Sequence, residues 1–296
     1  MPGKLTSVIS SSHAEKGRQW LIALPALVRK IAEDWQLTVL EPYPNLSYHY
    51  VAPCFCKDGT GAVLKIGFPE ENREMFNEAA ALELVAGEGM VKLLRFDGTR
   101  RAMLLERLDP GRNLKEVFAG DPLEAADVTI DVMRKIWREP PPETPFPKLE
   151  DWFINGFRKA VNAGFAPEYV RKAGRFFEDL NSAGRRVLLH GDLHHENILS
   201  AARAPFLAID PKGITGNFAY EITTFLINHR NWLAAEPDLT AQLGAAIQRF
   251  SEAFKIAPGA IRKWTFAQCV LSAWWTFEEN SKNWQDELAR AEIWEV

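Results

Sequence analysis

The chain has 296 residues, of which 47% are hydrophobic and 25% are charged, enough for about two folding units of 100 to 200 residues each. Its net charge of −4 provides no positive field for a polyanion, which excludes nucleic acid as the partner and favours a cationic one. No segment approaches the roughly 20 apolar residues of a membrane helix, and the N-terminal segment lacks the apolar core of a signal peptide. We therefore expect a cytoplasmic protein without a membrane partner.

The first third of the sequence predicts a sheet with one inserted helix. Residues 14–36 have apolar side chains at helical spacing, which predicts a leading helix with a kink near Pro25. Short alternating or apolar runs, separated by turn signals such as DGTG, then predict antiparallel strands. These runs are LTVL, YHYVAPCFC, GAVLKIGF, MVKLLRFDG and RAMLLERL, with a predicted helix in EENREMFNEAAALELVAGEG before the last two.

From residue 113 onward the pattern is mostly helical. A proline-rich connector at residues 138–148 interrupts it, and short strands are expected around RRVLLHGD, NILS and PFLAID. The shift in composition places a boundary near residues 106–111. We therefore predict an N-terminal lobe of residues 1–108 and a C-terminal lobe of residues 109–296.

The segment LLHGDLHHENILS concentrates histidines and acids in one loop between apolar runs, a composition that is typical of a functional site and rare in a core. It is compatible with two chemistries. A kinase catalytic loop would work through Asp192 and Asn197, with the histidines as bystanders. A metal-dependent hydrolase would instead use four residues as ligands, namely His190, Asp192, His194 and His195.

The rest of the chain favours the kinase. A histidine-rich metal site takes further ligands from other loops, yet only three histidines lie elsewhere in the chain. A kinase needs a lysine on a strand, an acid on the next helix, a loop Asp and Asn, and a metal-binding Asp shortly afterwards. The chain has these residues in that order: Lys65, Glu78, Asp192, Asn197 and Asp210.

The strand AVLKIG explains how a lysine comes to face the site. Side chains alternate along a strand, so Leu64 and Ile66 would pack on one side while Lys65 points to the other. Glu78 lies in the body of the following predicted helix. Glu74, one helical turn earlier, is the alternative partner of the lysine.

HGDLHHENIL and the D-P-x-G in LAIDPKG resemble the aminoglycoside phosphotransferase branch of the protein-kinase-like fold. Four further segments are similar to the streptomycin phosphotransferase and hydroxyurea-resistance kinase subfamily: GRQWLIALPALVRKIAEDWQL, VLKIGFPEENREMFNEAAAL, LLERLDPG and AIDPKGITGNFAYEI. The resemblance extends from residue 17 to about residue 230. It implies an α+β fold of two lobes, a small N-terminal lobe with an antiparallel sheet plus a helix and a larger, mainly helical C-terminal lobe.

The resemblance also implies roles and cofactors, namely ATP and Mg²⁺. Lys65 would bridge the α and β phosphates while paired with Glu78, and Asp192 would accept the proton of the attacking hydroxyl or orient it. His190 would hold the loop by a hydrogen bond to the backbone near Asp210. Asn197 and Asp210 would bind the metal, and adenine would lie against the segment that includes Leu105, Glu106 and Leu108.

Two segments depart from the family pattern. YPNLSYHYV, the expected strand-turn-strand over the phosphates, has no glycine where kinases have a flexible glycine-rich loop. In GITGNFAYE, Asn217 and Phe218 stand where relatives often have Asp-Pro, which we expect to affect the substrate side.

The expected activity is ATP-dependent transfer of the γ-phosphoryl group to a hydroxyl of a small molecule, an aminoglycoside such as streptomycin or a related compound, with antibiotic resistance as the outcome. Glu221, Glu278 and Glu279 are candidates to bind a cationic acceptor. After Asp210 the chain has no A-P-E segment of the kind that helps protein kinases to hold peptides. Two alternatives remain open, a catalytically silent kinase-like binding protein and the metal-dependent hydrolase, and the sequence is compatible with a monomer and with a homodimer.

Overall fold

The structure is a computed structural model, and it describes residues 3–46, 48–69, 73–236, 238–279 and 283–295. The chain divides into an N-terminal unit, Met1–Gly111, and a C-terminal unit, Arg112–Val296. The division falls directly after Gly111, the last residue of LDPG, whereas the expected boundary followed residue 108. Among the described residues, no helix is both long and apolar enough to cross a membrane.

The N-terminal unit is built on an antiparallel sheet with the strand order β1-β2-β3-β5-β4. Alternate residues of β2 are buried, as expected for a strand with one face in a core. The β2–β3 turn is stabilised by Asp58, whose side chain accepts a hydrogen bond from the Thr60 N–H. The strands are β1 Thr38–Val39, β2 His49–Phe55, β3 Gly61–Gly67, β4 Leu93–Asp97 and β5 Ala102–Glu106.

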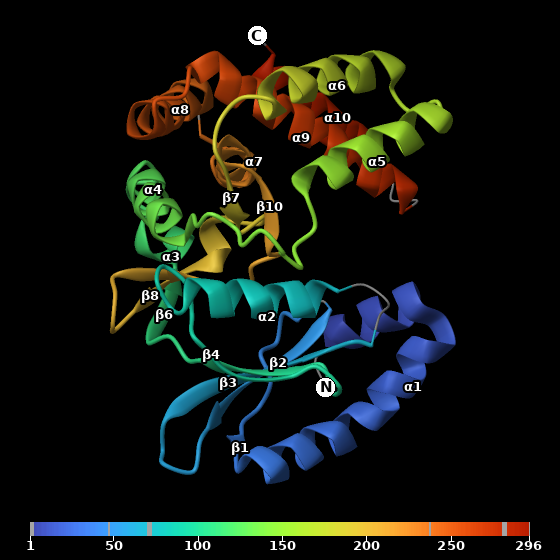
Figure 1. The fold of residues 1–296 in the computed structure, drawn as a ribbon, viewed down its shortest axis with the longest axis vertical. Coiled ribbons are helices and arrows are strands. Elements are labelled where there is room, and N and C mark those ends of the chain that lie inside the picture. Colours follow the sequence, from blue (N-terminus) through green and yellow to red (C-terminus); the bar gives the residue numbers. More distant parts are fainter. Residues whose placement is uncertain (1–2, 47, 70–72, 237, 280–282, 296) are drawn as a thin grey trace. The chain divides into compact units, whose positions relative to one another are not determined.

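Helices α1 (Gly3–Trp35) and α2 (Glu74–Val85) cover the two faces of this sheet (Figure 1). The core on the α1 face joins helix residues such as Leu24 and Ile31 to alternate strand residues such as Leu64. Because β3 residues alternate, the next side chain, Lys65, faces α2 instead.

The leading helix bends where the predicted range begins. A helical stretch from Gly3 precedes that range, the backbone leaves helical geometry at Ala14 (φ 44°, ψ −122°), and the helix then continues to Trp35 as expected. Gly17, just after the bend, explains the close approach there, since a Cβ at this position would lie 2.4 Å from the carbonyl oxygen of Ile9. Pro25 lies inside the helix, and the kink expected there stays a prediction.

The C-terminal unit is mainly helical. Helix α9 is the central element, because α5, α6, α7, α8 and α10 all pack against it. Its aromatic core includes Trp264, which contacts the rings of Phe153, Phe177 and Tyr220. The helices are α3 Leu114–Val117, α4 Glu124–Ile136, α5 Leu149–Asn162, α6 Pro167–Asn181, α7 Glu221–Trp232, α8 Leu239–Phe254, α9 Pro258–Glu278 and α10 Trp284–Ala291.

Short strands and turns carry the functional loops of this unit. Strand β7 pairs with β10 in an antiparallel ladder, and a three-stranded sheet has the order β6-β8-β9. The sequence predicted β7, β8 and β9, but not β6 or β10, which are four residues long each. These elements are β6 Pro110–Asn113, β7 Arg186–Leu189, η1 His195–Asn197, β8 Ile198–Ala201, β9 Phe206–Ala208, β10 Ile214–Asn217, η2 Phe218–Tyr220 and η3 Glu292–Trp294.

Candidate active site

The N-terminal unit contains a buried ion pair. Lys65 Nζ lies 2.8 Å from Glu78 Oε1 and 2.7 Å from Oε2, so both carboxylate oxygens accept hydrogen bonds from the lysine. Each residue is only 4% exposed. Of the two acids considered, Glu78 is thus the partner of Lys65, because α2 presents it to β3. A buried pair of this geometry holds the ammonium group in one place, at a desolvation cost that its hydrogen bonds offset.

The segment that follows β5 has its own hydrogen bonds. The N–H of Glu106 donates to the carbonyl of Lys92 at 2.9 Å, and the Glu106 side chain accepts from the Lys92 N–H at 3.0 Å. The Glu106 N–H is thus already used within the N-terminal unit. Gly111 has φ +69°, and a Cβ there would lie 2.9 Å from the carbonyl oxygen of Leu108, so this turn requires glycine.

The expected phosphate loop is the connection between β1 and β2. Two hydrogen bonds extend the hairpin beyond β1, from Leu40 N–H to the Pro53 carbonyl and from Tyr43 N–H to the Val51 carbonyl. Ser47, part of the same predicted segment, lies outside the described residues. This hairpin takes the place of the glycine-rich loop of kinases. Its β2 strand pairs with the end of β3 that carries Lys65.

In the C-terminal unit, His190 connects the catalytic loop to the segment before Asp210. Its Nδ1 accepts from the Asp192 N–H at 3.2 Å, so the ring hydrogen is on Nε2, which donates to the Ile209 carbonyl at 2.8 Å. The His190 carbonyl accepts from the Lys212 N–H at 2.7 Å. Burial lowers the pKa of His190 to about 4, which keeps the ring neutral and this arrangement intact. This is the backbone contact expected of His190.

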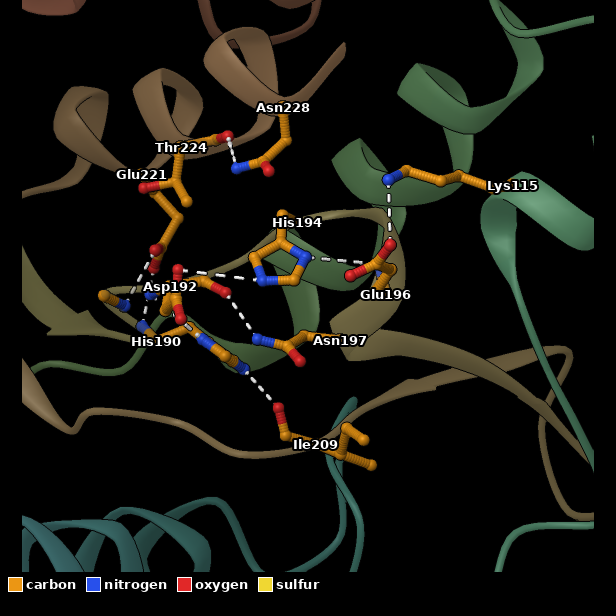
Figure 2. Close-up of polar contacts among 11 residues, drawn as sticks. Lys115, His190, Asp192, His194, Glu196, Asn197, Ile209, Glu221, Thr224 and Asn228 are labelled. Atoms are coloured by element: carbon orange, nitrogen blue, oxygen red, sulfur yellow. Dashed lines mark hydrogen bonds and ion pairs between the residues drawn. The ribbon is translucent and has the colours of Figure 1, made fainter. Parts of the chain in front are cut away.

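Asp192 and Asn197 lie side by side in this loop (Figure 2). Asn197 Nδ2 donates to the Asp192 main-chain carbonyl at 2.9 Å, which orients the amide so that Oδ1 points away from that carbonyl. The Asp192 side chain is 38% exposed. Desolvation raises its pKa, against the opposing effect of His194 and Lys212. The loop thus offers one accessible carboxylate and one oriented amide oxygen.

Asp210 has a left-handed backbone, with φ 61°. A non-glycine residue in this region carries strain of about 1 to 3 kcal/mol, which the surroundings must hold. They do so on both sides, because the Ile209 N–H donates to the Asn197 carbonyl at 2.9 Å and the Lys212 N–H donates to His190. The same bonds bring Asp210 to the loop that carries Asn197.

Gly191 permits this close approach. It has φ +81°, and a Cβ there would lie 3.1 Å from the Cβ of Lys212 and 3.2 Å from a side-chain carbon of Ile214. Any other residue would push the segment after Asp210 away from the catalytic loop.

Glu221 was expected to be one of the carboxylates that bind the acceptor, and this expectation was wrong. It is fully buried at the start of α7, and its two oxygens accept the N–H groups of His190 at 2.6 Å and Gly191 at 2.9 Å. Burial raises its pKa to about 7. Glu221 therefore holds the backbone that precedes Asp192 and does not face an acceptor.

We expect Glu221→Gln to lower kcat by about 100-fold, the effect of a misplacement of about 1 Å in the catalytic loop. Glutamine has one acceptor oxygen, so one buried N–H loses its partner, at a cost of about 1 to 3 kcal/mol in unfolding free energy. Steady-state kinetics and urea unfolding measure the two effects. Glu178→Gln, at an exposed position of α6, is the matched control. Wild-type kcat in the Glu221 variant would contradict this role.

The expectation for Asn217 was also wrong. Asn217 is 3% exposed, and its Oδ1 accepts from the Ala219 N–H at 3.0 Å, so it caps the turn η2. Its Nδ2 donates to the carbonyls of Leu180 and Ala183. The residue anchors the start of α7, and thereby Glu221, rather than the substrate side.

His195 anchors the other end of the loop to α7. Its Nε2 lies 3.0 Å from His229 Nδ1, and its ring stacks on that of Phe225 at 4.3 Å. Glu221, Phe225 and His229 are spaced four residues apart, so one face of α7 holds both ends of the catalytic loop. Burial lowers the pKa of both histidines, to about 4 for His229.

The burial of His190, His195 and His229 predicts that the protein loses stability in acid. Three histidines are neutral in the folded protein, whereas in the unfolded chain they bind protons below their usual pKa of about 6.5. The unfolding free energy should therefore fall as the pH drops from 6.5 toward 4, by about 1.4 kcal/mol per pH unit for each histidine. Glu221, with its raised pKa, opposes this change between about pH 7 and its usual value.

Urea unfolding at pH 7, 6 and 5 measures this slope, and His229→Leu should make it shallower by about one histidine's contribution, about 1.4 kcal/mol per pH unit. A stability independent of pH over this range would contradict the buried neutral state of these rings.

The histidine rings do not converge on one point. His190 donates to Ile209, His195 pairs with His229, and His194 Nδ1 accepts from the Glu196 N–H. Within the described residues, no group of three or more His, Cys, Asp or Glu is placed to hold a metal ion. The geometry therefore does not favour the metal-dependent hydrolase.

Glu278 and Glu279, the remaining acceptor candidates, are exposed at the end of α9. Glu278 pairs with Lys159 of α5 at 2.8 Å. An exposed pair of this kind contributes little to stability and can be exchanged for a ligand.

The residues within the motifs were predicted from the sequence, but the residues that hold them in place were not. Glu221 and His229 were not recognised as partners of the loop, although their spacing with Phe225 on one helix face was visible. That spacing alone is equally typical of a core-facing helix stripe.

Two features together define a protein-kinase-like phosphotransferase. One is the five-stranded sheet with its buried lysine-glutamate pair, and the other is the loop with Asp192, Asn197 and nearby Asp210. Residues 45–280 match the aminoglycoside/hydroxyurea antibiotic resistance kinases, and the chain belongs to this family. It is thus a small-molecule kinase.

Comparisons with individual proteins agree. The chain is 30% identical to streptomycin 6-kinase of Streptomyces griseus over 94% of its own length and 91% of the relative's. It is also 30% identical to hydroxyurea phosphotransferase of Kitasatospora aureofaciens, over 99% and 85% of the two chains. A choline/ethanolamine kinase family protein from Mesorhizobium loti has a similar fold, with a TM-score of 0.66, 15% identity and coverage of 92% and 94%.

Proposed function

We propose that the protein transfers the γ-phosphoryl group of ATP to a hydroxyl of streptomycin or a closely related aminoglycoside. The similarity to streptomycin 6-kinase over nearly the whole of both chains is the observation that carries this proposal. The negative net charge suits a cationic acceptor of this kind.

ATP would bind the N-terminal unit through its phosphates and its base. The Lys65 ammonium, held by Glu78, would contact the α and β phosphates. Adenine would lie against Leu105 and bond to the main chain of Glu106 and Leu108. Since the Glu106 N–H is already bonded to Lys92, its carbonyl would accept from the adenine amino group.

Magnesium would be held by Asn197 Oδ1 and Asp210. Carboxylate and amide oxygens suit its preference for hard ligands, and the Nδ2 hydrogen bond of Asn197 leaves Oδ1 as the outward atom. The ion, when bound, neutralises charge that develops on the phosphates. The strained backbone of Asp210 would set the direction of its carboxylate.

Asp192 would accept the proton of the acceptor hydroxyl. Its carboxylate is accessible and flanked by a rigid backbone, and a pKa raised by desolvation brings it nearer to the working pH of a general base. Transfer through a loose transition state demands little from a base beyond orientation and timely proton removal.

The test uses purified full-length protein with magnesium and ATP, and three acceptors in parallel: streptomycin, hydroxyurea and choline. Mass spectrometry should find streptomycin with one added phosphate. Asp210→Asn should weaken magnesium-dependent binding of a non-hydrolysable ATP analogue in calorimetry, which tests the metal assignment separately. Transfer to hydroxyurea or choline but not to streptomycin would refute the proposed acceptor.

A further inference from the structure

His194 has a defined tautomer. It is the N-cap of η1, and its Nδ1 accepts from the Glu196 N–H at 3.2 Å. A ring nitrogen that accepts a hydrogen bond carries no hydrogen, so in the neutral ring the hydrogen is on Nε2. The capping bond therefore makes Nε2 a hydrogen-bond donor.

This donor faces the carboxylate of Asp192. Nε2 lies 3.9 Å from Asp192 Oδ1, which is too long for a direct hydrogen bond. Figure 2 shows the His194 ring directed toward Asp192 on one side and Glu196 on the other. Both facing side chains are accessible, with 18% of His194 and 38% of Asp192 exposed.

An oxygen atom fits this arrangement. At hydrogen-bond lengths of about 2.8 Å to both atoms, one oxygen can bridge a gap of 3.9 Å. Such an oxygen must donate to a carboxylate and accept from an N–H. A hydroxyl group or a water molecule does both, whereas an ammonium or guanidinium group has no lone pair to accept.

We propose that His194 is a further catalytic residue, which donates its Nε2 hydrogen to the acceptor hydroxyl that Asp192 deprotonates. One lone pair of the hydroxyl oxygen accepts from His194, and the other attacks the γ-phosphorus. A new oxygen–phosphorus bond forms, the bond from the γ-phosphorus to the β,γ-bridging oxygen breaks, the proton passes to Asp192, and ADP leaves. This inference rests on the proposed phosphotransfer.

The pair has a consequence for specificity. An aminoglycoside presents hydroxyls beside cationic nitrogens, and Asp192 by itself would attract the cationic groups more strongly. The N–H of His194 is a donor directed at the same point. A cationic group there would face this N–H and could not accept a hydrogen bond from it. His194 thus selects the hydroxyl as the group that reaches the phosphate.

Two substitutions separate the donor from the cap. His194→Asn keeps a side-chain acceptor for the Glu196 N–H, because asparagine is a good N-cap, but it lacks a donor at the reach of Nε2. His194→Gln places an amide N–H near the Nε2 position. We expect the Asn variant to lose about 10- to 100-fold in kcat/KM for the acceptor, with unchanged KM for ATP and unchanged Tm, and the Gln variant to recover most of the loss.

Magnesium-dependent hydrolysis of ATP without an acceptor is measured on the same proteins, because water would occupy the same position and should show the same order of variants. Hydrolysis that follows this order, without transfer to streptomycin, would refute the proposed acceptor and support the role of His194. Wild-type turnover in the Asn variant would refute the role of His194 alone. If both variants lost Tm and ATP affinity equally, His194 would act only as a structural cap, and its catalytic role would be refuted. If the wild type showed neither transfer nor hydrolysis, both proposals would be refuted.

Discussion

Asp192→Asn is expected to lower kcat by about 10²- to 10⁴-fold, the usual contribution of a general base, while ATP affinity stays at the wild-type level. Asparagine has the same shape, and the hydrogen bonds that position this residue use its backbone, namely its N–H to His190 and its carbonyl from Asn197. The loop should therefore keep its structure. The variant loses only the carboxylate that accepts the proton.

Single-turnover kinetics measure the chemical step, and calorimetry with a non-hydrolysable ATP analogue measures the affinity. Asp179→Asn, an exposed acid on α6, controls for the loss of one charge. If the Asp192 variant kept turnover within a few-fold of wild type, the base would have to be another group. If it lost nucleotide affinity as well, the substitution would have disturbed the loop.

Lys65→Met is expected to abolish measurable nucleotide binding and to lower the unfolding free energy by about 3 to 5 kcal/mol. The substitution removes the cation that would contact the phosphates. It also leaves the Glu78 carboxylate without its ammonium partner at a position that is 4% exposed. The stability loss reflects mainly this desolvated carboxylate.

The double variant Lys65→Met/Glu78→Leu separates the two effects. Replacing both partners with apolar side chains removes the unpaired charge, so the unfolding free energy should return to within about 1 to 2 kcal/mol of wild type. Nucleotide binding should stay absent, because no cation faces the phosphates. Recovery of binding in the double variant would contradict the role of Lys65, and an unchanged stability in the single variant would contradict the burial of the pair.

The side chains proposed to be catalytic could be picked out from the sequence for a local reason. Asp192 and Asn197 lie within one short loop between apolar strands, and Lys65 lies on an alternating strand, so their types and spacing carry the pattern. The sequence left two candidates for the partner of Lys65, Glu78 and Glu74, which are one helical turn apart. Only the packing of α2 on the sheet selected Glu78 over Glu74.

The supporting residues were not predictable, and Glu221 was misplaced. Glu221 was a candidate, with Glu278 and Glu279, because carboxylates of the C-terminal lobe suit a cationic acceptor, and nothing near it in the sequence indicated that it is buried. In the structure it meets the N–H groups of His190 and Gly191, which are about thirty residues earlier in the chain. Those buried N–H groups require hydrogen-bond acceptors, but the sequence near Glu221 does not indicate that Glu221 supplies them.

The sequence by itself determined the fold class and the candidate catalytic residues, because periodicity and motif spacing act within short segments. The tertiary structure alone decided the bend at Ala14, the short strands β6 and β10, and the two contacts that hold the catalytic loop on α7. These depend on which distant backbone and side-chain groups meet when the chain packs. A buried contact of this kind is stronger than the same contact on the surface, because buried polar groups cannot exchange their partner for water, and it therefore positions the site.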